Sequence, residues 1–92
     1  MTTYMVLCTF KPGTAMDEVF AVVGEEQAQV KELEDEGRLG AIHLSLERGT
    51  VFLEVFADDA EGAEETVRTL PMSAWWDLDV YPTGAPVLPE LG

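Results

Sequence analysis

Apolar and polar residues alternate along several stretches of the chain, as they do in β-strands. Residues 2–10 are apolar on both sides of this alternation, which predicts a strand in the interior of a sheet. Two further alternating stretches, residues 39–47 and 50–57, are separated only by Arg48-Gly49 and predict an antiparallel hairpin. A fourth strand is predicted over residues 75–82, where one side of the alternation is apolar and the other is mixed.

Two other stretches repeat their apolar residues at the spacing of a helix. Residues 14–36 form a long amphipathic pattern, typical of a helix lying on a sheet. Gly24 in its middle costs about 1 kcal/mol relative to alanine, so either the helix bends there or another backbone comes close. The second helix is capped by Asp58 or Asp59 and ends at Leu70-Pro71, because proline cannot continue a helix.

The order strand, helix, strand, strand, helix, strand predicts an α+β fold of the ferredoxin-like βαββαβ type. Its sheet has four antiparallel strands, and two helices cover one face. Residues 1–82 form this single domain, and residues 83–92, with two of the chain's prolines, form an extended tail. The uncovered face is too apolar to remain in water, so we expect a homodimer packed face to face, a dimeric α+β barrel with a pocket inside.

A two-residue hairpin loop would fix which residues of the hairpin lie opposite each other. Ser45 would then face Phe52, and His43, the single histidine, would face the carboxylate of Glu54. All four side chains would lie on the uncovered face. The same face is predicted to carry Phe56, Trp75, Asp77 and Tyr81.

Composition narrows the choice of partners. The formal net charge of −13 repels phosphate backbones and anionic lipids, so neither nucleic acid nor membrane is expected as a partner. We expect a cytoplasmic location, because the sequence shows neither a membrane span nor a secretory leader. The single cysteine, Cys8, is expected to be a small core residue. No cofactor or metal is predicted from the motifs.

Each candidate residue has a chemical and a structural interpretation. His43 could act as a base oriented by Glu54, or it could be a structural histidine. The aromatic residues could stack on a flat substrate, or they could be core. Asp77 could donate a proton or bind substrate, but charges near a strand start are more often solvated.

Several segments resemble those of the muconolactone isomerases and their relatives among dimeric α+β barrel proteins. The similar segments are Glu36-Gly37, Leu70-Pro71-Met72 and Asp77-Leu78-Asp79-Val80, and the resemblance covers about residues 3 to 82. It implies a small, cofactor-free protein that assembles into dimers or larger homo-oligomers. It also implies that Glu26, matching an acidic residue of the family's first helix, is a proton-transfer group.

We therefore expect an isomerase or cyclase that moves a proton in a small cyclic substrate, either a lactone or an aromatic, polyketide-like ring. His43 would be the base, with Glu26 or Tyr81 as a second proton carrier. The isomerases have Trp, His and Arg where this chain has residues 38–44, so a less charged substrate than muconolactone is expected. A cofactor-free monooxygenase of the same architecture and a non-catalytic ligand-binding or assembly protein remain alternatives.

Overall fold

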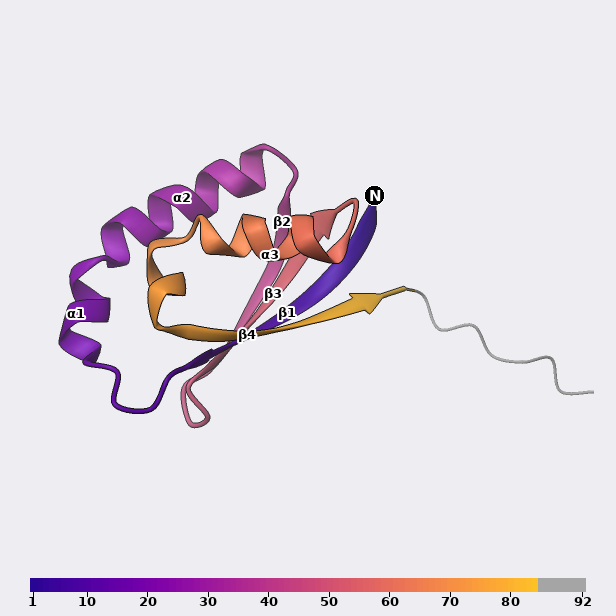
Figure 1. The fold of residues 1–92 in the computed structure, drawn as a ribbon. Helices are drawn as coiled ribbons and strands as arrows, with labels where there is room; N and C mark the ends of the chain where they lie inside the picture. The colour runs from indigo at the N-terminus through magenta and orange to yellow at the C-terminus, as the bar shows by residue number, and fades with distance from the viewer. Residues whose placement is uncertain (85–92) are drawn as a thin grey trace, which may run out of the picture.

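The computed structural model describes residues 1–84 as four strands and three α-helices with one short 3₁₀ helix, shown in Figure 1. The elements in chain order are β1 (Thr2–Phe10), α1 (Met16–Ala21), α2 (Val23–Asp35), β2 (Leu39–Ser45), β3 (Thr50–Ala57), α3 (Ala60–Arg68), the 3₁₀ helix η1 (Pro71–Trp75) and β4 (Trp76–Thr83). Of the predicted tail, Thr83 belongs to β4, and residues 85–92 lie outside the described residues.

The strands form one antiparallel sheet in the order β2-β3-β1-β4. The helices lie on one face of this sheet, and the other face carries no helix among the described residues (Figure 1). The predicted α+β fold of ferredoxin-like type is thus confirmed. No helix in the described part of the chain combines the length and the apolar character needed to cross a bilayer.

The first predicted helix is broken into α1 and α2. The break is at Val22, whose backbone leaves the helical region at φ −105° and ψ 10°. A Cβ on Gly24 would meet nothing within 4 Å, so no backbone approaches closely there, and the bend lies two residues earlier. The break makes α1 a separate short helix beyond the end of α2 (Figure 1).

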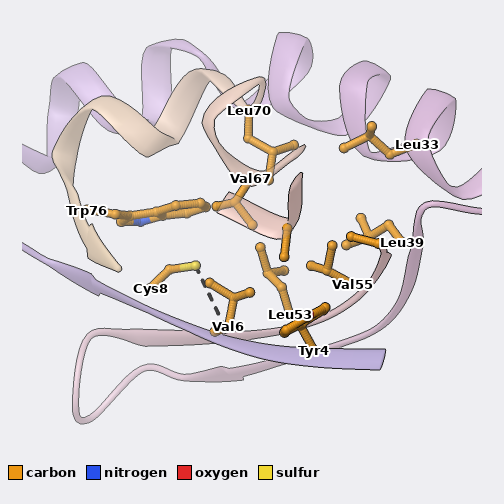
Figure 2. Close-up of a cluster of buried hydrophobic side chains, with 12 residues drawn as sticks. Tyr4, Val6, Cys8, Leu33, Leu39, Leu53, Val55, Val67, Leu70 and Trp76 are labelled. Atoms are coloured by element: carbon orange, nitrogen blue, oxygen red, sulfur yellow. Dashed lines mark hydrogen bonds between the residues drawn. The ribbon is translucent and has the colours of Figure 1, made fainter. Parts of the chain in front are cut away.

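The hydrophobic core lies between the sheet and the helices. Val6 and Cys8 of β1 are fully buried there, and Trp76 at the start of β4 is 1% exposed. Figure 2 shows Val6 and Cys8 below Val67 and Leu70 of the helical layer, with the ring of Trp76 at the level of Val67. The predicted helix stop at Leu70-Pro71 and the burial of Trp76 are therefore both confirmed.

The hairpin between β2 and β3 has a longer loop than predicted. The strands stop at Ser45 and resume at Thr50, and Gly49 in the loop has a φ of +60°, a backbone region that favours glycine. Ser45 therefore pairs with Thr50, and His43 pairs with Phe52. The predicted pairings of Ser45 with Phe52 and of His43 with Glu54 are wrong by two residues. A shift of two leaves the side chains of residues 42–45 on their predicted faces.

A β-bulge lies at the start of β2, between Leu39 and Ile42. A bulge leaves an extra residue outside the regular ladder. Here the backbone N–H of Ala41 is bound instead by Glu54 Oε1, at 3.1 Å. A Cβ on Gly40 would collide with the same carboxylate and would lie 2.9 Å from the ring of Phe56, so any larger residue there requires these side chains to move.

Candidate functional site

The strand pairings place the predicted open-face residues in rows across the sheet. His43 lies opposite Phe52, which is followed across the sheet by Leu7 and Asp79. Tyr81 lies one row away and on the same face as His43. However, β2 and β4 are opposite edges of the sheet. Three strand spacings separate them, or roughly 14 Å, so His43 and Tyr81 cannot act on one small molecule within a single subunit.

The predicted pair of His43 and Glu54 is not formed. The Glu54 carboxylate accepts the hydrogen bond from the Ala41 amide, and the cross-strand neighbour of His43 is a phenylalanine. The physical reason is the four-residue loop, which moves Glu54 two residues along the ladder from His43. The role of the Glu54 carboxylate is therefore structural, because it stabilises the bulge.

Tyr81 is also engaged in a local contact. Its hydroxyl donates a hydrogen bond of 2.8 Å to Asp79 Oδ2, and the residue is 47% exposed. This bond, together with the negative charge of Asp79, raises the pKa of the Tyr81 hydroxyl. A phenol held in its protonated form is a poor base at neutral pH.

The remaining predicted binding residues are divided between the centre and the margins of the open face. Phe52 and Phe56 are half-buried on β3, an inner strand, whereas Ser45 and Asp77 belong to the two edge strands. Trp75 was predicted to begin the last strand. It is instead the final residue of η1, and its carbonyl accepts a hydrogen bond of 2.8 Å from the Lys11 amide.

Glu26 belongs to α2 on the helix-covered side of the sheet and is buried there, so the prediction that it acts in one pocket with His43 and Tyr81 of the open face is wrong. Only 8% of Glu26 is exposed, and its Oε1 accepts a 2.9 Å hydrogen bond from the backbone N–H of Met72 in η1. Burial raises the pKa of this carboxyl above its ordinary value, and the bond from the Met72 amide opposes the rise in part. A carboxyl whose pKa is raised by burial is suited to proton transfer near neutral pH.

The sequence contains a signal for this burial. Val19, Glu26 and Leu33 are spaced seven residues apart, and all three are buried. A glutamate at an apolar position of a helical stripe is unusual, because buried carboxylates are costly unless they have partners. The resemblance pointed to Glu26, but this spacing points to it independently.

The buried thiol of Cys8 interacts with the charges of both Glu26 and Arg68. Burial and the charge of Glu26 raise the pKa of the Cys8 thiol to about 12, while Arg68 acts in the opposite direction. Arg68 Nη1 donates hydrogen bonds to the carbonyls of Ser73, at 2.7 Å, and Trp76, at 3.4 Å. Arg68 and Glu26 thus hold η1 from α3 and from α2. Among the described residues, the buried indole Nε1 of Trp76 has no hydrogen-bond partner.

An apolar groove of about 190 Å³ opens on the same side of the sheet, where α1, the β2–β3 hairpin and η1 meet. Its lining is entirely apolar and consists of Phe10, Met16, Val19, Phe20, Val23, Leu44, Leu46, Val51 and Met72. Sequence reasoning missed this groove, since it depends on the break at Val22 and on the longer hairpin loop.

Met72 connects the groove with Glu26. Its side chain is part of the groove lining, and its backbone N–H is bound to the Glu26 carboxylate. Val23, another lining residue, precedes Glu26 by three positions on α2, so both lie on the same face of that helix. The structure therefore brings together an apolar binding space and a buried carboxyl.

A wider depression of about 410 Å³ lies along α3 and is lined by Glu61, Glu64, Glu65, Arg68 and Thr69. It is acidic, and neither Glu26 nor the predicted open-face residues belong to it. We assign no chemistry to it.

Comparisons of the sequence with models of protein families and with curated proteins found no match.

Proposed function

We propose that this protein is a cofactor-independent enzyme that moves a proton within a small cyclic substrate, of isomerase or cyclase type. The observation that carries the proposal is the buried carboxyl of Glu26 beside the apolar groove, joined to it through Met72. The groove would hold the ring, and Glu26, in its protonated form, would give its proton to one ring carbon and take a proton back from another. The resemblance to the muconolactone isomerases supports the same reaction class.

Met72 has a specific part in this proposal. It lines the groove with a side chain that is unbranched and has several rotatable bonds. When the substrate enters, this side chain turns aside and gives the ring access to the Glu26 carboxyl. The Met72 amide stays bound to Oε1, so the carboxylate keeps its orientation.

The proposal includes a homodimer formed through the open sheet face. Half-buried apolar side chains of the two inner strands, Met5, Leu7, Phe52 and Phe56, occupy the centre of that face, and polar residues of β2 and β4 lie at its margins. An apolar centre with a polar rim is the usual anatomy of a protein interface. In this arrangement His43 and Tyr81 belong to the dimer contact.

Proton exchange with solvent tests the proposed chemistry without requiring the natural substrate. A neutral five-membered unsaturated lactone with a 5-methyl group is incubated with the protein in D₂O, and deuterium entry at its ring carbons is followed by ¹H NMR. Muconolactone, its carboxymethyl analogue, is tested in parallel. We expect exchange with the wild type and a loss of about 100-fold or more in Glu26→Gln, in line with the contribution of general acid–base groups.

Glu54→Gln is the matched control, because Glu54 also accepts a backbone amide through its Oε1 but lies on the open face. It should retain wild-type exchange. Equal rates in Glu26→Gln and the wild type would rule out Glu26 as the proton carrier. A product carrying an oxygen atom from O₂ would instead select the monooxygenase.

The second candidate is a protein that binds a small ligand without reacting with it. The wholly apolar lining of the groove favours it, since none of the nine lining side chains can donate or accept a proton at neutral pH. Saturable binding of the lactones with no deuterium entry in any variant would select this function.

A further inference from the structure

We propose that the apolar groove takes up one neutral molecule of one or two rings together with one proton, which is held by the Glu26 carboxylate. The inference rests on the proposed site and adds two properties to it, the class of ligand and a dependence of binding on pH. It follows from the size and lining of the groove and from the position of Glu26.

The size of the groove limits the ligand. Apolar protein cavities of about 150 Å³ stay dry and bind benzene, and this groove measures about 190 Å³. A single ring or a fused pair of small rings is therefore the largest body that it can enclose.

The charge of the groove and of the whole chain limits the ligand to a neutral molecule. The lining contains no cation to bind an anionic group. The chain as a whole carries 18 acidic residues against 5 basic ones, so an anion is repelled before it reaches the groove. Arg68, which like Glu26 acts on the Cys8 thiol, already donates hydrogen bonds to the carbonyls of Ser73 and Trp76. A neutral ring is the chemistry that remains.

The linked proton follows from the exposure of Glu26. Glu26 as a whole residue retains 8% of its surface, so its desolvation is incomplete. A neutral ring in the groove excludes water from the neighbourhood of Met72 and Glu26, and desolvation disfavours the charged form of a carboxyl. The carboxylate then binds a proton from solvent and becomes neutral.

The other groups that face Glu26 do not supply this proton. Cys8 on β1 stays a neutral thiol, since its pKa is raised to about 12, and the guanidinium of Arg68 on α3 donates its hydrogen bonds to the carbonyls of Ser73 and Trp76. The contact from η1 is the backbone amide of Met72, which does not titrate. Glu26, whose pKa is already raised by burial, is therefore the group of this cluster that takes up the proton.

Calorimetric titration with indole, a neutral two-ring probe, tests the inference. Titrations at pH 8 in phosphate and in Tris, which differ in ionisation enthalpy, give the number of protons bound with each indole. We expect uptake of up to about one proton and an indole Kd that rises by up to tenfold per pH unit above neutrality. In Glu26→Gln, which keeps an acceptor for the Met72 amide, both the uptake and the pH dependence should disappear.

Control variants test whether indole binds in the groove and whether Glu26 binds the proton. Glu54→Gln should behave like the wild type, because its carboxylate lies on the other face. Leu44→Glu puts a charge into the groove at a residue that is 56% exposed and should abolish binding, whereas Ile42→Glu, two residues away and 41% exposed, lies outside the lining and should not.

Binding of indole without proton uptake, uptake that persists in Glu26→Gln, or no binding at all would each overturn the inference. Indole has no lactone proton to exchange, so its titration is independent of the deuterium assay. If exchange fails and linked binding is seen, the enzyme proposal falls and this inference stands. If exchange depends on Glu26 and indole binding carries no proton, the reverse holds.

Discussion

Glu26 and Glu54 make the same contact on opposite faces of one sheet. Each accepts a hydrogen bond from a backbone amide through Oε1, at 2.9 Å for Glu26 and 3.1 Å for Glu54. Glu54 binds the amide of a bulge on an exposed edge strand, where water can replace it. Glu26 binds an amide beneath the helices and is 8% exposed. The comparison teaches that environment, more than the contact itself, determines what a carboxylate can do.

The two faces differ in the same way. The covered face combines an apolar groove with a buried titratable group, and the open face has apolar residues at its centre and separated polar residues at its margins. The first arrangement suits a reaction on a small molecule. The second suits contact with another protein surface.

The largest expected effect is dissociation of the proposed dimer by a charge on the open face but not by one on the covered face. Phe52→Glu places a charge in the apolar centre of the open face and should convert the proposed dimer to monomer, because a buried unpaired charge is costly at an interface. Sedimentation equilibrium at tens of micromolar measures the mass. Leu44→Glu makes the same change of charge on the covered side and should leave the mass unchanged. A monomeric wild type would refute the dimer.

The next effect compares the two carboxylates by their removal. Glu26→Ala leaves the Met72 amide without its acceptor beneath the helices, which should lower the free energy of unfolding by about 1–3 kcal/mol. Glu54→Ala exposes the Ala41 amide to water and should cost less than about 1 kcal/mol. Urea denaturation measures both. Equal losses would mean that burial does not distinguish the two sites.

Backbone packing on the open face gives a smaller effect. Gly40→Ala pushes a methyl group against the Glu54 carboxylate and the Phe56 ring, and these side-chain ends must move. We expect a loss of about 1 kcal/mol in urea denaturation. Gly24→Ala is the matched control, because a Cβ at this position meets nothing within 4 Å. This substitution should stabilise the protein by about 0.5–1 kcal/mol. Stabilisation by both substitutions would contradict the tight packing at the bulge.

The smallest expected effect is a pH dependence of stability. Since the pKa of Glu26 is raised in the folded protein, the folded state keeps a proton over a pH range in which the unfolded chain has lost it. The resulting stabilisation is fully present below the unfolded pKa and is lost as pH rises through the folded pKa. Thermal unfolding between pH 4 and pH 8 should show the wild type losing stability relative to Glu26→Gln. Glu54→Gln serves as the reference variant, and a constant difference across this range would argue against the shift.

The sequence predicted those parts of the fold that depend on local pattern. The proline at position 71 ended a helix, and the alternation after Trp75 gave a strand with Trp76 in the core. The predicted pairing of the hairpin strands was wrong because the loop is longer than two residues. The dipeptide Arg48-Gly49 marks a turn, but it does not specify the length of the loop, which depends on the backbone geometry at Gly49. The observed register differs from the predicted one by two residues. His43 therefore keeps its predicted face but does not lie opposite Glu54.

The candidate site was harder to predict because it depends on contacts between distant segments. Glu26 could be selected from its position in the sequence, but its partner Met72 is 46 residues away. The groove needs the helix break at Val22, where no glycine or proline marks the change. Such features depend on where α1 lies relative to the hairpin, which no local pattern contains.

The buried thiol has a practical consequence for studying this chain. Cys8 is the single cysteine of the chain, is fully buried, and has a pKa raised to about 12. Alkylating reagents therefore cannot react with it in the folded protein. Its neighbours in β1 are paired on both sides, with β3 and β4. Modification of this sulfur therefore requires β1 to be released from its neighbours, and alkylation under native conditions reports this opening.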